Sequence, residues 1–299
     1  MKQAGRNRHR NSRQQKWQRQ TTIQKAILTL IFLAIILTAV IVILALTKKK
    51  PEQNPEATTL QTETETSEEE QKTEEDSLQP EVDDDGSITG SNGQMIYLTF
   101  DDGPGESTYQ LLDILDAYNI KATFFVLLNE YREEEYREII RRGHEIGVHS
   151  TSHDYGVLYA DIDAFIEDVS TCRDYVENVT GHRLFLYRFP GGTNNQVHDV
   201  SISRCIEYLQ SVGLTHFDWN ISSGDAAGIT VDKEELVNNL LGRIHENGNS
   251  TLVVLMHDSA VKTTTLEALK EVLPILIQEG YGFSKITTET PQIYFEAYD

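Results

Sequence analysis

The stretch Ile96-Tyr97-Leu98-Thr99-Phe100-Asp101-Asp102-Gly103-Pro104 joins an apolar run to two adjacent acids and a turn. Later apolar runs also end in polar residues suited to hydrolytic chemistry. In a parallel sheet or barrel built from strand–helix units, all strand C-terminal ends face one way. We therefore expect these polar side chains to meet at one mouth. The later runs end at His149, Arg188, Asp218 and His257.

Alternating strand and helix patterns continue from Met95 to the end of the chain. Ser, Asp or Thr near the predicted helix starts, and Gly after several predicted helix ends, fit the preferences of helix caps. This alternation predicts an α/β fold with a parallel sheet or barrel. The expected strands are 95–100, 121–127, 145–149, 184–188, 215–221, 250–257 and 282–287, and the expected helices are 107–118, 133–142, 161–179, 200–212, 232–246 and 264–279.

The N-terminal region predicts a membrane anchor. Residues 1–25 hold eight Lys/Arg and no acid, and residues 26–46 carry no charge. The uncharged segment is long enough to cross a bilayer as a helix, and the basic residues before it favour a cytoplasmic N-terminus. The alternative is a cleavable signal peptide, but the segment is long for one and lacks a good cleavage site. Either interpretation places residues 47–299 outside the cell, and the first predicts a single-pass protein of the cell membrane.

Charge separates the remaining chain into two parts. Residues 47–94 hold fourteen acids and four Lys and few large apolar residues, so we expect a disordered, acidic tether. Residues 95–299, the expected catalytic domain, have a net charge of −19. Such a domain repels the phosphate backbone of nucleic acid. We therefore interpret the basic residues 1–25 as a cytoplasmic topology signal, not as an arm for nucleic acid.

Two cysteines, Cys172 and Cys205, both fall on predicted helices of the exported domain. Neither has a neighbour at metal-ligand spacing. An oxidising compartment permits a disulfide between them, and two buried free thiols fit the sequence equally well.

Asp102, His149 and His153 form a candidate metal site of one oxygen and two nitrogen ligands. The two histidines are four positions apart, so one helical turn would place both on the same side. The set suits zinc or a similar first-row ion, with coordination positions left open for water and substrate.

Asp101 precedes that candidate ligand and follows a strand that should be buried. An unpaired carboxylate is costly there. A general base beside a metal site is a use for this second acid. Arg188 is expected to pair with Asp101 and hold it ionised, a role compatible with a structural salt bridge.

His257 ends the most apolar predicted strand and is a candidate general acid. Either Asp225 or Asp218 is placed to orient its imidazole and raise its pKa. Gly191 and Gly192 leave backbone N–H groups unobstructed, as an oxyanion donor requires, although a tight turn explains the same residues.

These motifs together resemble the NodB-like polysaccharide deacetylases of carbohydrate esterase family 4. The resemblance covers nearly all of residues 95–299. It implies a distorted (β/α) barrel of about seven parallel strands, which removes N- or O-acetyl groups from sugars with a divalent metal, zinc first and cobalt or a similar ion otherwise. The motifs are Thr99–Pro104, His149–His153, Arg188–Gly191, Asp218–Asp225 and Leu255–His257.

The resemblance also assigns roles to residues. It implies that Asp101 is the base and His257 the acid, that Arg188 supports the base, and that Asp225 tunes the acid. It implies a metal bound by Asp102, His149 and His153, an oxyanion contact from the Gly191 N–H, and Trp219 at the substrate groove. Two positions depart from the family pattern, because many members have an aromatic residue in place of Gly191 and a tryptophan in place of Ala226.

We therefore expect a monomeric, membrane-anchored deacetylase of an acetylated cell-surface polysaccharide, with N-acetylglucosamine of peptidoglycan as the first substrate. Poly-N-acetylglucosamine, chitin oligomers and O-acetyl xylan are the alternatives within the class. A surface protein that binds carbohydrate without turnover is the rival from another class, and it would have no use for the acid–base pair Asp101 and His257.

Overall fold

The computed structural model describes residue 83 and residues 86–297. The expected cytoplasmic tail 1–25, the expected membrane helix 26–46 and most of the expected tether lie outside these residues. In the part that is described, no helix has the length and apolar character needed to cross a membrane.

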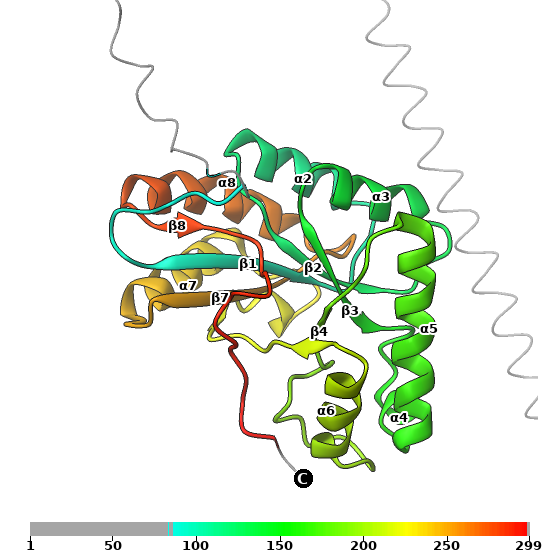
Figure 1. Ribbon diagram of the computed structural model, residues 1–299. Helices are drawn as coiled ribbons and strands as arrows, with labels where there is room; N and C mark the ends of the chain where they lie inside the picture. Colours follow the sequence, from blue (N-terminus) through cyan, green and yellow to red (C-terminus); the bar gives the residue numbers. More distant parts are fainter. Residues whose placement is uncertain (1–82, 84–85, 298–299) are drawn as a thin grey trace, which may run out of the picture. The chain divides into compact units, whose positions relative to one another are not determined.

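The described chain forms one sheet flanked by helices (Figure 1). Its path is β5-β4-β3-β2-β1-β7-β6, a run of seven parallel strands, and β8 pairs with the start of β1 beside this path. The expected α/β fold with about seven parallel strands is thus confirmed. The strands are β1 (Met95–Asp101), β2 (Thr123–Leu127), β3 (Glu145–Ser150), β4 (Leu186–Tyr187), β5 (Thr215–His216), β6 (Ile221–Ser222), β7 (Thr251–His257) and β8 (Gly282–Phe283).

The six longer helices match the expected ranges to within two residues at each end. They lie along the outer side of the sheet (Figure 1). Two short elements were not expected, namely α4 and the 3-10 helix η1. The helices are α2 (Thr108–Ala117), α3 (Glu133–Arg141), α4 (Tyr155–Leu158), α5 (Ile162–Thr180), α6 (Ile202–Ser211), α7 (Lys233–Glu246), α8 (Thr263–Gln278) and η1 (Asp225–Ala227).

The expected strand 215–221 is wrong as one element. The structure divides it into β5 and β6, which stand at opposite ends of the strand order, so the barrel is open between them. Arg188 explains the break. Its Nε donates to the carbonyl of Phe217 and its Nη2 to that of Asp218, both at 2.9 Å, so these two carbonyls bond to a side chain instead of a neighbouring strand.

Alternation along the strands gives the fold two apolar regions. In β1, Ile96, Leu98 and Phe100 belong to the large core that the helices cover, whereas Tyr97 belongs to a smaller cluster. Successive side chains of a strand point to opposite faces, so Thr99 and Asp101 share the face of Tyr97. This parity places Asp101 on the inner side of the curved sheet, at the end of β1.

The folded domain begins before Met95, the boundary expected from sequence. Ile88 is 2% exposed and forms an antiparallel bridge with Phe283 of β8. A Cβ atom on Gly90 would lie 2.2 Å from the backbone nitrogen of Gly282, so these two segments of the chain are in direct contact. Residues 88–90 therefore belong to the packed fold and not to the tether.

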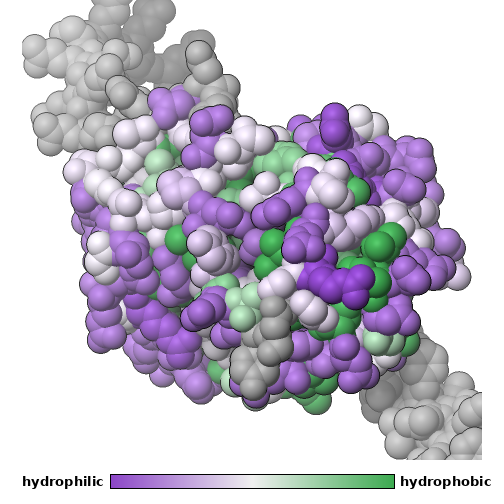
Figure 2. Space-filling view, turned by 60° about the horizontal axis from the view of Figure 1, so that its bottom comes forward, coloured by the Kyte–Doolittle hydropathy of each residue, from purple (hydrophilic) through white to green (hydrophobic). Residues whose placement is uncertain are grey.

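On the face shown in Figure 2, hydrophilic residues surround small, separate apolar patches. Cys172 and Cys205 are both buried and form no disulfide, which decides between the two alternatives that the sequence left open. Burial raises the pKa of Cys172 far above the ordinary range, so this thiol stays protonated and inert.

Candidate active site

The strand register brings the ends of the apolar runs together. Asp101 of β1 is paired with His257 of β7 and, on its other side, with Phe125 of β2. β3 follows β2 in the sheet and carries His149. The expected mouth at the strand C-terminal ends is therefore present.

Asp102, His149 and His153 form a compact cluster. Asp102 Oδ1 lies 3.6 Å from His149 Nε2 and 3.7 Å from His153 Nε2. One possible ligand atom from each residue lies within 4.8 Å of the others. Asp102 Oδ1 is buried and has no hydrogen-bond partner among the described residues, a costly state that a cation would relieve. The cluster thus fits a divalent metal.

His149 is prepared as a neutral ligand. Its Nδ1 lies 2.8 Å from the backbone oxygen of Arg188, and a carbonyl can only accept, so Nδ1 carries the proton. The lone pair is then left on Nε2, the atom that faces Asp102. Burial lowers the pKa of His149 to about 3, which keeps the ring neutral at ordinary pH. A second-sphere hydrogen bond of this kind is the usual support of a metal-binding histidine.

Two of the three candidate ligands have unusual backbones. Asp102 has a φ of 70° and His153 has a φ of 58°. Both values lie in the left-handed region, which costs about 1–3 kcal/mol for a residue other than glycine. Asp168 of α5 supports the second of them. Its carboxylate accepts hydrogen bonds from Ser150 Oγ at 3.0 Å and from the Thr151 N–H at 3.1 Å. Sequence patterns did not indicate Asp168, because only tertiary structure brings α5 beneath this loop.

Asp258 supports the loop that carries Asp102. It is fully buried, accepts a hydrogen bond from Ser107 Oγ at 3.0 Å, and donates its own N–H to the Asp101 carbonyl at 2.8 Å. A Cβ atom on Gly103 would lie 2.6 Å from Asp258 Oδ2, so this close approach requires glycine. Asp258 directly follows His257 in the chain, and no sequence motif indicated its supporting role.

Asp101 and Arg188 form the expected buried pair. Arg188 Nη1 donates to Asp101 Oδ1 at 3.0 Å and to Thr99 Oγ1 at 2.6 Å, and the guanidinium lies 4.1 Å from the centre of the Phe125 ring. Burial raises the pKa of Asp101, while the positive charge of Arg188 opposes that rise. The second carboxylate oxygen, Oδ2, lies 3.9 Å from His149 Nε2 and so faces the metal cluster.

His257 pairs with Asp225, which decides between the two acids left open by the sequence. Asp225 Oδ1 lies 2.8 Å from His257 Nδ1, and its Oδ2 accepts the His257 N–H at 2.9 Å. Burial alone would lower the pKa of His257, but the hydrogen bond to Asp225 and the charge of Asp101 outweigh it and raise the pKa. The imidazole is therefore disposed to carry a proton.

Asp218 has a different place. Its side chain accepts the N–H of Thr193 at 3.1 Å and the N–H of Phe295 at 2.8 Å. These bonds tie the turn after β4 and the C-terminal segment to the open side of the barrel. Asp218 is therefore a structural anchor.

Gly191 and Gly192 form a turn with φ of 81° and 82°. The Gly192 N–H donates to the Phe189 carbonyl at 2.8 Å, whereas the Gly191 N–H has no acceptor in the described part of the chain. A free N–H in this turn is what an oxyanion contact requires. The tight turn and the oxyanion donor, both considered from sequence, are thus compatible.

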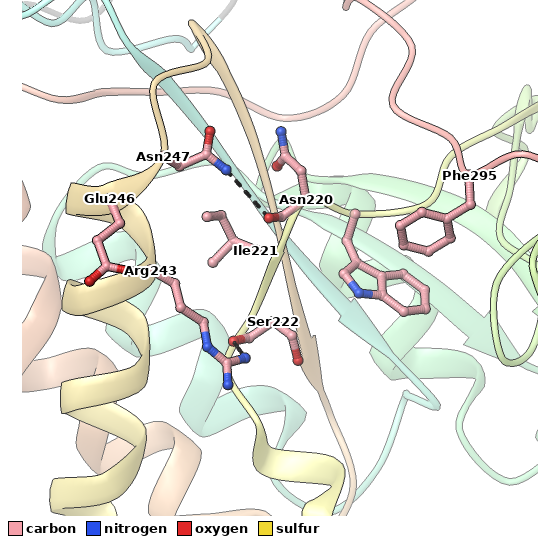
Figure 3. Close-up of a pocket in the computed structure, with 8 residues that line it drawn as sticks. Asn220, Ile221, Ser222, Arg243, Glu246, Asn247 and Phe295 are labelled. Carbon is pink, nitrogen blue, oxygen red and sulfur yellow. Dashed lines mark hydrogen bonds between the residues drawn. The ribbon is translucent and has the colours of Figure 1, made fainter.

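Trp219 lies close to this turn and is one of the residues that line a pocket beside β6 (Figure 3). Its ring packs edge-on against Phe295 at 5.1 Å and lies 5.8 Å from the guanidinium carbon of Arg188. A Cβ atom on Gly192 would lie 3.2 Å from the ring. Together with Asn220, Ile221, Ser222, Arg243, Glu246, Asn247 and Phe295, it lines a cavity of about 460 Å³ beside β6.

Comparison with known proteins agrees with this geometry. The family model for polysaccharide deacetylase matches residues 89–211. A peptidoglycan-N-acetylglucosamine deacetylase of Bacillus cereus is 30% identical over 217 residues, which cover 70% of this chain and 96% of that protein. The Bacillus subtilis protein YheN is 31% identical over 201 residues, which cover 63% of this chain and just under two thirds, 65%, of that protein.

One of the similar solved structures is also a peptidoglycan deacetylase. The catalytic domain of a peptidoglycan N-acetylglucosamine deacetylase from Eubacterium rectale superposes with a TM-score of 0.65 and 34% identity, over 69% of this chain and 94% of that domain. With this fold, this cluster of side chains and these relatives, the chain belongs to the polysaccharide deacetylase family, hydrolases that act on carbon–nitrogen bonds other than peptide bonds.

Proposed function

We propose that this protein removes the N-acetyl groups of N-acetylglucosamine in peptidoglycan with the aid of a divalent metal. The proposal rests on one observation. The Asp102–His149–His153 cluster lies beside Asp101 at the C-terminal ends of the strands. Relatives named as peptidoglycan-N-acetylglucosamine deacetylases in Bacillus cereus and Listeria monocytogenes support the choice of substrate.

Asp102, His149 and His153 would hold the metal, and their one oxygen and two nitrogen atoms favour zinc, with cobalt as a substitute. A divalent ion held there would act as a Lewis acid that polarises the acetamide and activates water for attack.

The residues of the chain then divide the proton transfers between them. Asp101 accepts a proton from the attacking water through Oδ2, while Arg188 holds its other oxygen. The Gly191 N–H donates a hydrogen bond to the acetamide oxygen as negative charge develops on it. A carbon–oxygen bond to the acetyl carbon forms, and the carbon–nitrogen bond of the amide breaks.

His257 completes the reaction by giving a proton to the departing amine nitrogen. The Nδ1–H is held by Asp225, so Nε2 is the atom that delivers the proton. The products are acetate and a sugar with a free amine. The two groups have different roles because they have different neighbours. The positive charge of Arg188 lies beside the base Asp101, whereas the negative charge of Asp225 lies beside His257 and favours its protonated, acidic form.

We further propose that residues 26–46 anchor a monomer in the cell membrane, with the N-terminus in the cytoplasm and the catalytic domain outside. The support is the uncharged length of that segment and the basic residues before it. The acidic stretch that follows would give the domain reach into the wall.

The test is acetate release by the purified full-length protein in detergent, with and without a chelator. The panel is peptidoglycan, N-acetylglucosamine oligomers, poly-N-acetylglucosamine and acetylated xylan. We expect release from peptidoglycan that the chelator abolishes and added zinc or cobalt restores. Release only from another glycan would reassign the substrate. Binding of glycans with no release from any of them would favour the non-catalytic alternative.

A further inference from the structure

Tyr155 is a residue of the mouth to which the sequence motifs assign no role. It is the first residue of α4, two positions after the candidate ligand His153. The side chain of Asp154 caps this short helix by accepting the Gly156 N–H at 3.0 Å. The Tyr155 ring lies 5.3 Å from the His153 ring and packs edge-on against the Tyr159 ring at 5.7 Å. These contacts fix the orientation of Tyr155.

The hydroxyl of Tyr155 points at the turn that carries the proposed oxyanion donor. A Cβ atom on Gly191 would lie 2.8 Å from Tyr155 Oη. The hydroxyl therefore occupies the space where a side chain at position 191 would begin. Because Gly191 has no side chain, this wall of the mouth is made by Tyr155 from another element.

The same hydroxyl has no hydrogen-bond partner among residues 86–297, and the side chain is only partly buried. A tyrosine hydroxyl that is both donor and acceptor usually finds a partner when it is removed from water. In the free protein water can bond to this hydroxyl, and in the proposed reaction the acetylated sugar is the group that would take the place of that water.

We propose that the Tyr155 hydroxyl forms a hydrogen bond with the acetylated sugar, next to the point where the Gly191 N–H contacts the acetyl oxygen. Tyr155 is then a residue that selects a sugar substrate, in addition to the residues that transfer protons. The inference rests on the proposed function, because it requires a sugar acetamide in this mouth.

The first experiment compares Tyr155→Phe with the unsubstituted full-length protein on an N-acetylglucosamine oligosaccharide. Loss of one neutral hydrogen bond raises KM about tenfold and leaves kcat nearly unchanged. Metal content should not change. Tyr131→Phe is the matched control, because Tyr131 is 95% exposed in the loop between β2 and α3, and it should leave KM unchanged.

A small acetyl ester without a sugar, 4-nitrophenyl acetate, identifies the part of the substrate that is contacted. Tyr155→Phe should hydrolyse this ester at the unsubstituted rate. Equal losses on the ester and on the oligosaccharide would overturn a contact with the sugar, and so would an unchanged KM on the oligosaccharide. No acetate release from any glycan by the unsubstituted protein would instead remove the proposed function, and this inference with it.

The contact between the two residues gives a second measurement. Gly191→Ala introduces a Cβ atom within 2.8 Å of Tyr155 Oη and should reduce kcat/KM. Part of that loss should be absent when Tyr155 is already phenylalanine, because the crowded oxygen is gone. Strictly additive losses in the double variant would show that the hydroxyl does not lie against position 191.

Discussion

Asp101 and His257 are paired residues of the neighbouring parallel strands β1 and β7. Adjacent strands lie about 4.8 Å apart, so the sheet itself sets the spacing between the proposed base and the proposed acid. Asp101 adds to the raised pKa of His257 through its charge, which couples the two groups. The acid–base pair is thus built into the register of the sheet.

Asp101→Asn should separate the base from the metal site. It keeps the shape of the side chain and leaves Asp102, His149 and His153 in place. We expect near-normal metal content and a rate about 10²–10⁴-fold lower, the usual contribution of general acid–base catalysis. Asp102→Asn should instead lose metal, and added zinc should restore part of its activity. Metal analysis and acetate release on both variants would show whether these roles are reversed.

Asp225→Asn should move the alkaline limb of the pH–rate profile to lower pH. The native pKa of His257 is raised, and the variant loses the hydrogen bond and the charge that raise it. The acid must be protonated to act, so a lower pKa means that activity is lost at lower pH as the solution becomes alkaline. Asp113→Asn removes an exposed carboxylate that pairs with Arg142, and its profile should match the unsubstituted protein. If the alkaline limb of Asp225→Asn does not move, the pair of Asp225 and His257 does not control the pH dependence.

Arg188→Met should destabilise the domain as well as inactivate it. The substitution leaves Asp101 as a buried, unpaired carboxylate and frees the carbonyls of Phe217 and Asp218. Removal of one partner from a buried ion pair costs about 3–5 kcal/mol. Urea unfolding should show that the double variant Arg188→Met with Asp101→Asn loses less stability than Arg188→Met alone, because no charged carboxylate is left unpaired at position 101. A cost for the double variant equal to the sum of the two single costs would argue against this pairing.

Asp168→Asn should weaken metal binding without removing a ligand. Asp168 holds the loop between His149 and His153 through Ser150 and Thr151. Loss of an outer-shell partner typically costs about 10–100-fold in metal affinity. Asp163→Asn, an exposed change in the first turn of the same helix, is the control. Titration with zinc should distinguish the two variants, and equal affinities would show that Asp168 does not position the ligands.

Ile88→Ala should lower the free energy of unfolding by about 2–5 kcal/mol, the usual cost of truncating a buried isoleucine. Ile88 is 2% exposed and bridges to β8. For the same reason, a fragment that starts at Met95 should be less stable than one that starts at Asp83. Equal melting temperatures of the two fragments would show that residues 83–94 belong to the tether and not to the folded domain.

Much of the fold and of the candidate site follows from local patterns in the sequence. The run Ile96–Phe100 predicts a buried strand, and the acids after it predict chemistry at the strand end. Because parallel strands align their ends, Asp101, His149, Arg188 and His257 can be assigned to one mouth without knowledge of their distances. The helix ranges follow from periodicity and caps, which depend on neighbours a few positions away.

Contacts between distant segments decided the rest. The sequence itself determined the α/β class, the strand ends and the chemically active residue types, because each of these depends on the pattern of a few neighbouring residues. Only tertiary structure showed that Arg188 interrupts the expected strand 215–221, that Asp225 and not Asp218 meets His257, and that Tyr155 fills the space beside Gly191. A side chain bonds to whichever partner the folded chain brings within hydrogen-bonding distance, and sequence spacing does not encode that distance.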